Sequence, residues 1–333
     1  NTVQIGKERY LYLHDLEINL FKRFRFSLIE GTLINDDFEL RFLNPLMIMH
    51  SYGAWRQYSN DLEHKYYSES HVCQYIGFTV DIIPFKNCRI YALYSQNEIQ
   101  ANNELSTTYG KTLPNGIGAQ IGIEYNLPCK NNNWFIFNLE GLYTSPYLYV
   151  KQGKDWSLIS YRYNMLSNKS IPIYSWIGSP FGPDTLAFEA KITYKKFDKF
   201  TISLSYLLAA HGANNFSIFD STYTNEDGTF YSYYPSVLRL LGLLSDKEAE
   251  DIARDMSLTG IIQYTNQIKI YYSYSVNKNL KLNSELLFLS IINNKNIYVM
   301  TTMAIDELYD FIDNLKLNNE EKEISNLLLK EIL

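Results

Sequence analysis

The segment from residue 38 to residue 60 carries the most varied side-chain chemistry in the chain. It reads FELRFLNPLMIMHSYGAWRQYSN and combines charges, amides and aromatic rings over a short stretch. Aromatic faces can cover the apolar side of a sugar ring, while amide, carboxylate and guanidinium groups bond its hydroxyls. The segment therefore predicts a set of glycan contacts: Arg41, Asn44, His50, Tyr52, Trp55, Arg56 and Tyr58.

A second aromatic and polar group lies between residues 174 and 215. Its members are Tyr174, Trp176, Asp184, His211, Asn214 and Asn215. We expect Trp176 and Asp184 to contact a glycan or to gate a pore. The run from Gly178 to Asp184 is rich in glycine and proline, so turn formation alone explains much of the pattern.

Charged residues in the strand-like segments and near them predict a ladder of ion pairs. Charges enclosed by protein must be paired or wet. We expect the following residues to hold a polar interior together: Glu30, Glu39, Arg41, Glu124, Glu189 and Lys191. Glu30 and Glu39 could also be the two carboxylates of a glycosidase. The structural role is favoured, because a polar interior needs carboxylates without any catalysis.

Catalytic and metal-binding motifs do not stand out in this sequence. The five histidines lack the spacing of a zinc site, and no Gly-x-Ser-x-Gly sequence marks a nucleophile elbow. We therefore expect neither an enzyme, nor a metal site, nor a cofactor.

Two of the three cysteines flank neighbouring short turns. Cys88 opens an expected strand from 88 to 98, and Cys129 follows the expected strand from 117 to 127. These strands should be antiparallel neighbours, which brings Cys88 and Cys129 to the same edge of the sheet and leaves Cys73 at the other. A disulfide between Cys88 and Cys129 and three free thiols both remain open.

Composition narrows the class of protein. The chain has 333 residues, of which 46% are hydrophobic and 20% charged, as in folded proteins. The formal net charge is -6 and no basic cluster is interleaved with aromatics, so we expect no nucleic-acid partner. The 29 tyrosines suit strands and membrane–water boundaries. No apolar run approaches the ~18 residues of a membrane-spanning helix.

Alternating polarity with period two dominates the chain. It predicts long strands with one polar and one apolar side, most clearly at 117–127, 186–194 and 268–276. We expect short turns at 21–22, 84–87, 128–133, 197–199 and 277–279, and long connections at 99–116, 144–155 and 211–260. From residue 73 onward the two kinds alternate if a strand pair fills 156–177.

Short turns at one end of a sheet and long connections at the other are typical of outer-membrane barrels. The predicted fold is therefore all-β: an antiparallel transmembrane β-barrel of roughly 12–18 strands over residues 1–303. A soluble β-sandwich or soluble barrel is the alternative.

The opening segment departs from the alternation. Phe38 begins like a strand, but Asn44-Pro45 interrupts it, because proline cannot donate to a sheet. We expect residues 38–60 either to leave the wall and fold inward as a plug or to add one irregular strand. A polar interior tolerates such irregular backbone.

Helices are expected in two places. The long connection 211–260 contains an apolar helix at 236–244 and a second helix that opens with a capping box from Ser245 to Glu248. The tail at 304–333 has apolar residues at helical spacing and predicts a C-terminal helix.

Three stretches carry a family resemblance. They are Tyr12-Leu13-His14-Asp15-Leu16-Glu17, Glu39-Leu40-Arg41-Phe42-Leu43-Asn44-Pro45-Leu46-Met47 and Trp176-Ile177-Gly178-Ser179-Pro180-Phe181-Gly182-Pro183-Asp184. Together they resemble the Wzi-type capsule-assembly family of outer-membrane β-barrels, and Arg-x-x-Asn-Pro-Leu-Met is the sharpest motif. The family's barrel has more strands, so the chain resembles its C-terminal two-thirds or a shortened relative.

The resemblance implies a non-catalytic protein that binds, assembles or anchors a capsule-like surface polysaccharide. It implies the outer membrane of a diderm bacterium, reached through the periplasm, with lipid and surface polysaccharide as partners. We expect a monomer. The alternatives are a passive porin for small solutes and an adhesin-type barrel that acts through residues 211–260.

Overall fold

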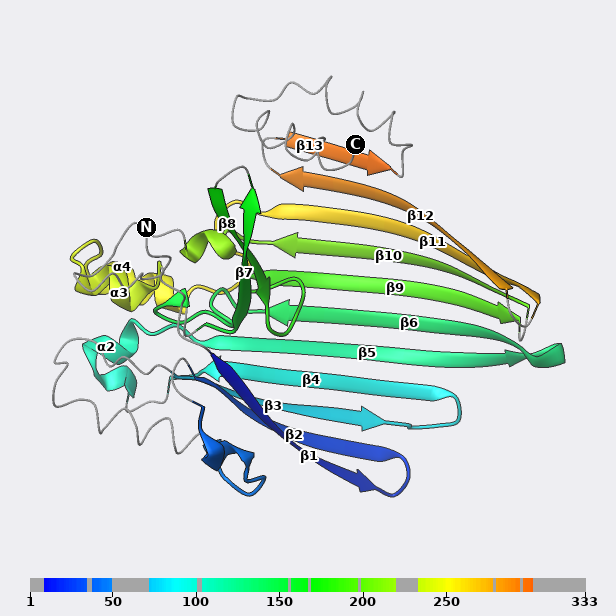
Figure 1. Ribbon diagram of the computed structural model, residues 1–333, viewed down its shortest axis with the longest axis horizontal. Coiled ribbons are helices and arrows are strands. Elements are labelled where there is room, and N and C mark those ends of the chain that lie inside the picture. The colour runs from blue at the N-terminus through cyan, green and yellow to red at the C-terminus, as the bar shows by residue number, and fades with distance from the viewer. Residues whose placement is uncertain are drawn as a thin grey trace.

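The computed structural model describes these residues: 9–34, 38–49, 72–100, 104–154, 157–166, 169–196, 199–219, 233–277, 280–293 and 296–301. They form one eleven-stranded antiparallel sheet and a separate two-stranded hairpin (Figure 1). The predicted all-β, antiparallel architecture is confirmed. No helix of the described residues is long and apolar enough to cross a membrane.

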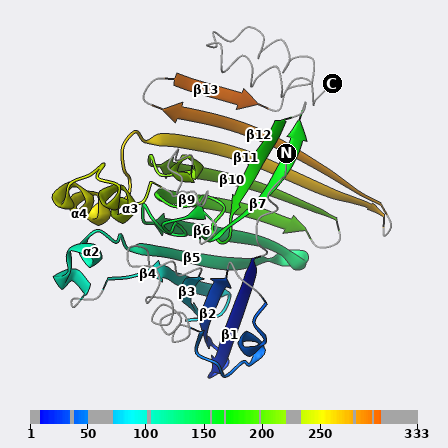
Figure 2. The same cartoon turned by 60° about the vertical axis from the view of Figure 1, so that its left-hand side comes forward.

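The strands follow one another along the chain. Their bounds are β1 Tyr10–Leu20, β2 Phe24–Ile34, β3 Val72–Ile82, β4 Cys88–Glu98, β5 Gly116–Cys129, β6 Asn133–Thr144, β7 Ile159–Leu166, β8 Lys169–Trp176, β9 Thr185–Lys196, β10 Phe200–His211, β11 Gln263–Asn277, β12 Leu280–Asn293 and β13 Asn296–Thr301. In the large sheet each strand pairs with the next, and β6 pairs directly with β9. Strands β1 and β13 are the two edges, and Figure 2 shows the sheet curling between them.

Short and long connections are sorted to opposite ends of the large sheet, as predicted. The short turns after β1, β3, β5, β9 and β11 lie together at the right of Figure 1. Three residues connect β1 to β2, and the first two of them, Phe21 and Lys22, adopt positive φ, at 53° and 59°, as in turns that fit twisted strands. The long connections leave the sheet at the other end, after β2, β4, β6 and β10. The turn between β12 and β13 is an exception, since it is short and lies at that end too.

The register gives the large sheet two unlike faces, because successive side chains of a strand point to opposite sides. The polar face carries two rows of directly opposed residues, Arg25-Asp81-Tyr91-Gly122-Glu140-Glu189 and Arg89-Glu124-Asn138-Lys191-Ser205-Lys269. The apolar face carries side chains that are each more than a third exposed: Leu28, Phe78, Ile121, Leu139, Phe188, Ile192, Leu204, Ile270 and Leu286. These side chains are therefore left largely uncovered by the described part of the chain.

The strand pair expected at 156–177 exists, but it is not part of the large sheet. Strands β7 and β8 pair only with each other. Strand β6 instead pairs along its whole length with β9, from Asn133 opposite Lys196 to Thr144 opposite Thr185. The large sheet therefore has eleven described strands, fewer than the roughly 12–18 expected of an outer-membrane wall.

Both helices predicted in the long connection are present. Helix α3, Pro235–Leu240, starts with proline at its first turn and ends earlier than predicted, because Gly242 adopts a φ of 70° just beyond it. Helix α4, Asp246–Arg254, has the predicted capping box, in which Ser245 and Glu248 bond each other's backbone. The remaining short helices are η1 Leu40–Leu43, η2 Glu104–Ser106, α2 Thr108–Lys111, η3 Lys130–Asn132 and η5 Phe216–Phe219.

Residues 38–49 do not begin a strand, which corrects the prediction for Phe38. They contain the 3-10 helix η1 and pack on β1, where Phe42 lies 4.9 Å from the Tyr12 ring. The Glu39 amide donates to the Tyr12 hydroxyl at 2.8 Å. Tyr12 alternates with Leu11 and Leu13 and belongs to the apolar face, so this segment leaves the wall without entering the polar side.

The buried core lies at the end with the long connections. Residues 145–184, which we call the cap, pack on the polar face at this end, where Leu148 and Tyr149 meet Leu33 and Cys73 of the sheet. The other side of the cap packs against η5 and α3 through Tyr147, Val150, Ile159, Ile218, Phe219, Tyr234 and Val237. The segment that covers the polar face is therefore the connection between β6 and β9.

Two predictions fall outside the described residues. One is the C-terminal helix at 304–333. The other is the second half of the expected plug, residues 50–60.

Candidate functional site

The ion pairs of the polar face centre on Asp81 in β3. Arg89 donates to Asp81 Oδ2 from Nε at 2.8 Å and from Nη2 at 2.5 Å. Arg25 places Nη2 3.5 Å from the same oxygen and Nη1 3.5 Å from Glu17 Oε2. The Asp81 side chain is 14% exposed, while Arg25 and Arg89 are 48% and 44% exposed. One carboxylate is thus held between two guanidinium groups that still face solvent.

Tyr91 carries the network across a whole strand. Its hydroxyl donates to Glu140 Oε2 at 2.5 Å, although β5 separates β4 from β6. Gly122 of β5 lies in the same row, and a Cβ there would overlap the Tyr91 ring. Arg89 lies 4.9 Å from the ring centroid, within cation–π range. Gly122 therefore provides the space that Tyr91 needs to reach Glu140, which faces Glu189 on β9.

The second row is also paired. Glu124 accepts from the side-chain amides of Asn126 at 2.7 Å and Asn138 at 3.3 Å. Near the far edge, Lys269 Nζ lies 3.0 Å from Glu285 Oε1. The charges and amides of the polar face are therefore linked from β1 to β6, and a separate ion pair joins β11 to β12.

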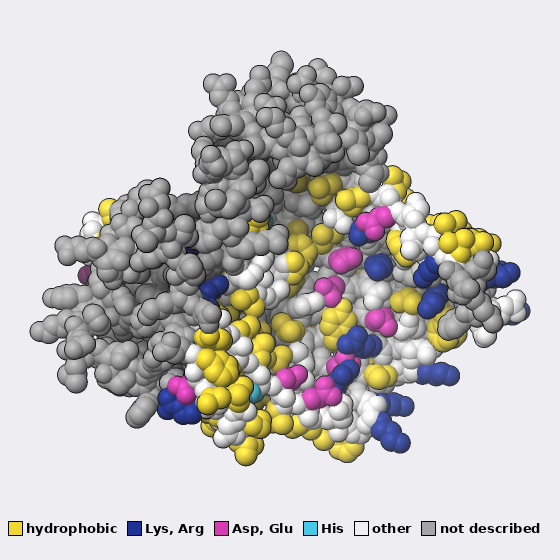
Figure 3. All heavy atoms as spheres, in the orientation of Figure 1, with side chains coloured by type: hydrophobic (Ala, Val, Ile, Leu, Met, Phe, Trp, Pro, Cys, Tyr) yellow, Lys and Arg dark blue, Asp and Glu magenta, His cyan; other side chains and the backbone are white. Residues whose placement is uncertain are grey.

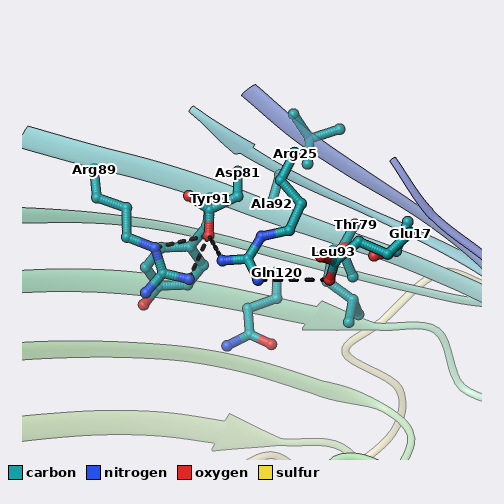
Figure 4. Close-up of a pocket in the computed structure, with 11 residues that line it drawn as sticks. Glu17, Arg25, Thr79, Asp81, Arg89, Tyr91, Ala92, Leu93 and Gln120 are labelled. Carbon is teal, nitrogen blue, oxygen red and sulfur yellow. Dashed lines mark hydrogen bonds and ion pairs between the residues drawn. The ribbon is translucent and has the colours of Figure 1, made fainter. Parts of the chain in front are cut away.

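A pocket of about 270 Å³ opens on the polar face between β1 and β5 (Figure 4). Its lining includes Glu17, Arg25, Asp81, Arg89, Tyr91 and Gln120. In Figure 4 Gln120 lies near the two arginines, and no interaction joins its side chain to the other residues drawn. Guanidinium, amide and carboxylate groups that converge on one hollow can bond several ligand hydroxyls at once.

Several polar groups of the pocket are already bound to other side chains. Its tyrosine hydroxyl is committed to Glu140, and its aspartate to two arginines. Within the described ranges no three His, Cys, Asp or Glu side chains gather closely enough to hold a metal ion. The groups left for a ligand are hydrogen-bond donors and acceptors.

The cap is fixed to the wall by backbone and side-chain contacts. Asn97 of β4 accepts from the Tyr149 amide at 3.0 Å and donates to the Val150 carbonyl at 3.5 Å. Leu148 lies over Gly118 of β5, where an added Cβ would come within 2.7 Å of Leu148 Cδ2. The absence of a side chain at Gly118 therefore sets how closely the cap approaches the sheet.

A nearly buried ion pair joins the cap to β4. Lys151 binds Glu98, and their side chains are only 12% and 24% exposed. Burial alone would lower the pKa of Lys151, but the Glu98 carboxylate contributes most to reversing this, and the pKa is raised. Lys151 therefore stays charged at neutral pH. Removing one partner of such a pair is costly, because the other is left charged in a low-dielectric site.

Asp184, just before β9, joins the connection 145–184 to both ends of the connection 212–262. It is fully buried and adopts a φ of 54°. Its Oδ2 accepts from Thr259 Oγ1 at 2.5 Å and from the Asn214 amide at 3.2 Å. Gly212 packs directly on the carboxylate and has no room for a Cβ. These structural bonds occupy the carboxylate and leave no exposed surface for the predicted glycan contact.

The second aromatic and polar group gathers around the cap. The Trp176 ring centroid lies 6.1 Å from that of Tyr149 and 6.0 Å from that of Phe219, so the indole is half-buried in packing contacts. Asn214 donates to the Pro146 carbonyl at 3.1 Å. Tyr174, Trp176, Asp184 and Asn214 of this group lie at the cap, and the contacts described here are structural.

Arg41 and Asn44 lie on the 38–49 segment, away from the polar face. Arg41 binds Glu39 with two hydrogen bonds, at 2.9 Å and 2.8 Å, and is 58% exposed. Asn44 Oδ1 accepts from the Leu46 amide in a local turn. The other predicted contacts of this segment lie outside the described residues: His50, Tyr52, Trp55, Arg56 and Tyr58.

The members of the predicted charge ladder lie on different faces of the large sheet or outside it. Three lie on the polar face: Glu124, Glu189 and Lys191. Glu30 does not, because the register places it opposite His14 and Ile76 in a row of the apolar face. Glu30 is charged, but its position in the alternation of β2 puts it on the apolar face. The alternation, and not the charge, decides which face a side chain occupies.

The cysteines are free thiols, so the disulfide between Cys88 and Cys129 is not formed. Strands β4 and β5 are antiparallel neighbours as predicted, but Cys88 lies opposite Tyr125. Cys129 is four residues farther along β5, which is about 13 Å at the rise of a strand. That offset exceeds the reach of a disulfide.

Sequence reasoning missed the residues that line the pocket, although one signal could have found them. A predicted turn at 84–87 fixes the register of its two strands, and this places Asp81 beside Arg89 and Tyr91 on one face. Arg25 follows from the turn at 21–22 and the next pairing. The alternation alone gave the polar positions, but not which residues meet.

Comparisons of the chain with protein-family models, curated proteins and solved structures found no match. No family is assigned on this basis. The resemblance described from the sequence stays a prediction.

Proposed function

We propose that this protein is an outer-membrane β-barrel that binds a surface polysaccharide without catalysis. In this proposal the apolar face contacts lipid and the polar face lines the interior, with the wall closing between β1 and β13. The observation that carries the proposal is the separation of charged rows and exposed aliphatic side chains onto opposite faces of one sheet. A wide exposed apolar surface is unfavourable in water and is accommodated by lipid.

An aromatic belt supports the assignment of the apolar face. Seven rings form a chain across neighbouring strands near the short turns: Phe85, Tyr125, Phe137, Phe135, Tyr194, Phe200 and Tyr272. Aromatic rings favour the boundary between lipid and water. Tyr143 and Tyr264 lie eight residues farther along β6 and β11, which is about 27 Å along a strand. At a tilt near 40° this gives an apolar band roughly 20 Å tall, close to that of known barrels.

The ligand proposal rests on the pocket and on the cap. The pocket offers two half-exposed arginines and the amide of Gln120 on the face that would line the interior. Such planar polar groups match the hydroxyls of a sugar chain. The cap covers the same face at the long-connection end, which in outer-membrane barrels is external. The resemblance to the Wzi-type family points to the same ligand class.

The membrane assignment is tested with the refolded full chain. We expect heat-modifiable migration on gels and protection of the strands from protease in lipid vesicles. Recovery of the chain as a folded, detergent-free monomer in water would contradict it.

The ligand assignment is tested by a glycan-array screen, followed by titration of any glycan retained. Gln120→Ala should weaken binding roughly tenfold, because a ligand hydroxyl loses its partner. Gln267→Ala is the matched control, since it lies on the polar face at β11, outside the pocket. Equal loss in both variants, or no retained glycan, would contradict the proposed subsite.

A passive porin remains the alternative function, favoured by the paired charges of the polar face. Because the cap covers one end of that face, we expect little conductance in planar bilayers. Stable, large single-channel steps would favour the porin over the polysaccharide binder.

A further inference from the structure

The end of the sheet with the short turns is strongly basic. Lys195 lies at this end and has an interaction partner; the other described cations, which we call the basic rim, are Lys22, Arg23, Lys86, Lys130, Lys196, Lys199 and Lys281. Figure 3 shows dark blue side chains along this right-hand edge. Over residues 20–24, 82–88, 127–133, 195–200 and 276–281 the sequence carries a single acid, Asp198, which lies outside the described residues. A chain of formal net charge -6 therefore concentrates positive charge at one end.

The basic rim is not neutralised by the rest of the described structure. The ion pairs described in this half of the sheet use Arg25, Arg89 and Lys269, which lie on the polar face. None of the described carboxylates pairs with a rim cation. Lys22, Arg23, Lys86, Lys130 and Lys199 are exposed. Seven like charges at one edge repel each other, so the arrangement favours an anionic partner.

The position of the rim identifies the partner. Lys86 follows Phe85 and Lys199 precedes Phe200, and both aromatics belong to the belt. Lys196 is two residues beyond Tyr194 on the same side of β9. A lysine beside an interfacial ring can extend its ammonium group from the apolar zone to the head-group level. Aromatic rings followed at once by cations match the order of layers at a membrane surface, acyl chain and then phosphate.

We infer that the basic rim binds the phosphate head groups of anionic phospholipids at the membrane surface, next to the aromatic belt. The inference rests on the proposed function, since it needs the belt to lie at a lipid boundary. Sequence scanning misses the rim, because its cations come from separate turns and meet only in the folded sheet. Each well-placed cation raises the association constant for anionic lipid about fivefold, and this effect weakens with salt.

The test is native mass spectrometry of the refolded full chain in mixed micelles. The micelles contain equal amounts of anionic phosphatidylglycerol and zwitterionic phosphatidylethanolamine. We expect phosphatidylglycerol to be retained at least about fivefold more often, with the preference falling at high salt. The double variant Lys86→Gln, Lys199→Gln should lose most of that preference.

The matched control is Lys111→Gln, Lys247→Gln, which removes two lysines at the opposite end. It should keep the preference, and heat-modifiable migration shows whether each variant folds. Equal retention of the two lipids, or equal loss in both double variants, would overturn the inference while the barrel stands. Displacement of phosphatidylglycerol by inorganic phosphate would also overturn it in favour of a free-phosphate site. A wild-type chain that fails to enter lipid would overturn the proposed function itself.

Discussion

Asp81 and Tyr91 stabilise the polar face by different amounts. The ion pairs of Asp81 involve arginines that are nearly half exposed, and such pairs contribute about 0–1 kcal/mol. The bond from Tyr91 to Glu140 is charge-assisted and less exposed to water, so it contributes more, about 1.5–3 kcal/mol. Stability therefore depends on the tyrosine, whereas the arginines retain donors for a ligand.

Tyr91→Phe tests this ranking. We expect a loss of about 1.5 kcal/mol in the free energy of unfolding, because Glu140 keeps its charge opposite Glu189 without a donor. The measurement is urea unfolding of the protein refolded in vesicles. Tyr271→Phe removes an exposed bond to the neutral Asn283 and should cost less. A larger loss for Tyr271→Phe would contradict the ranking.

Residue types alone predicted which strand positions are polar. They predicted only in part which face of the sheet each of these side chains occupies. Glu124 and Lys191 were placed correctly because their strands alternate cleanly on both sides of them. Glu30 was misplaced because its charge was weighted above the phase of Phe26 and Leu28. A one-residue change of phase moves a side chain to the opposite face, so phase is the better guide.

At the scale of elements, two glycines of β5 set the distance of other segments from the wall. Gly118→Ala should lift Leu148 and the cap, and Gly122→Ala should displace Tyr91. Overpacking of this kind costs about 1–3 kcal/mol. Gly141→Ala is the control, since no atom lies within 4 Å of the added Cβ. Urea unfolding with protease mapping of the cap measures all three, and equal stability of the three variants would contradict this account.

The cap should loosen in alkali before the wall does. Burial raises the pKa of Tyr149 from 10.0 to about 12, and burial also raises the pKa of Tyr147 and Tyr234. A raised folded-state pKa stabilises the fold fully below pH 10, and this stabilisation is lost as the pH rises from 10 towards 12. Protease cleavage within 145–184 should therefore increase over that range, in step with tyrosinate absorbance.

The control for this pH prediction is cleavage at the short turns, which contain no buried tyrosine. It should change little over the same range. Cleavage of the cap that begins below pH 9, where phenols stay neutral, would point to a different titrating group.

The sequence predicted that one segment leaves the large sheet. It did not predict which segment covers the polar face. Residues 38–60 were chosen because Asn44-Pro45 breaks a strand, and a break of that kind says only that pairing ends. The cap is recognisable instead by what surrounds it: Thr144 and Thr185 pair directly, so everything between them is excluded from the sheet. That pairing is a long-range contact, which local alternation does not encode.

For the whole molecule, the two faces of β10 give the sharpest test of a lipid-facing wall. Leu204 is on the apolar face and Leu207 on the polar face, opposite Glu189. In a bilayer Leu204→Arg should cost about 2–4 kcal/mol, and Leu207→Arg far less. The measurement is urea unfolding in vesicles. Equal costs would indicate that both faces meet water.

The overall arrangement of strands and turns was easier to predict than the contacts of single residues. The period of the polarity pattern and the length of a turn can both be read from a short stretch of sequence. Strand positions and the sorting of turns to the two ends follow from runs of alternating residues and from short stretches of Gly, Pro and Asn. The number of strands in the sheet was less predictable. A hairpin such as β7–β8 has strand periodicity whether or not it joins its neighbours.

The direct pairing of Thr144 with Thr185 has a consequence for engineering and for evolution. Two residues opposed in antiparallel strands lie about 5 Å apart, a gap that a tight two-residue turn can bridge. Residues 145–184 can therefore be exchanged as a cassette while the strands on either side keep their partners. We expect the site to accept a folded insert whose own ends lie close together, so the sheet could serve as a display scaffold.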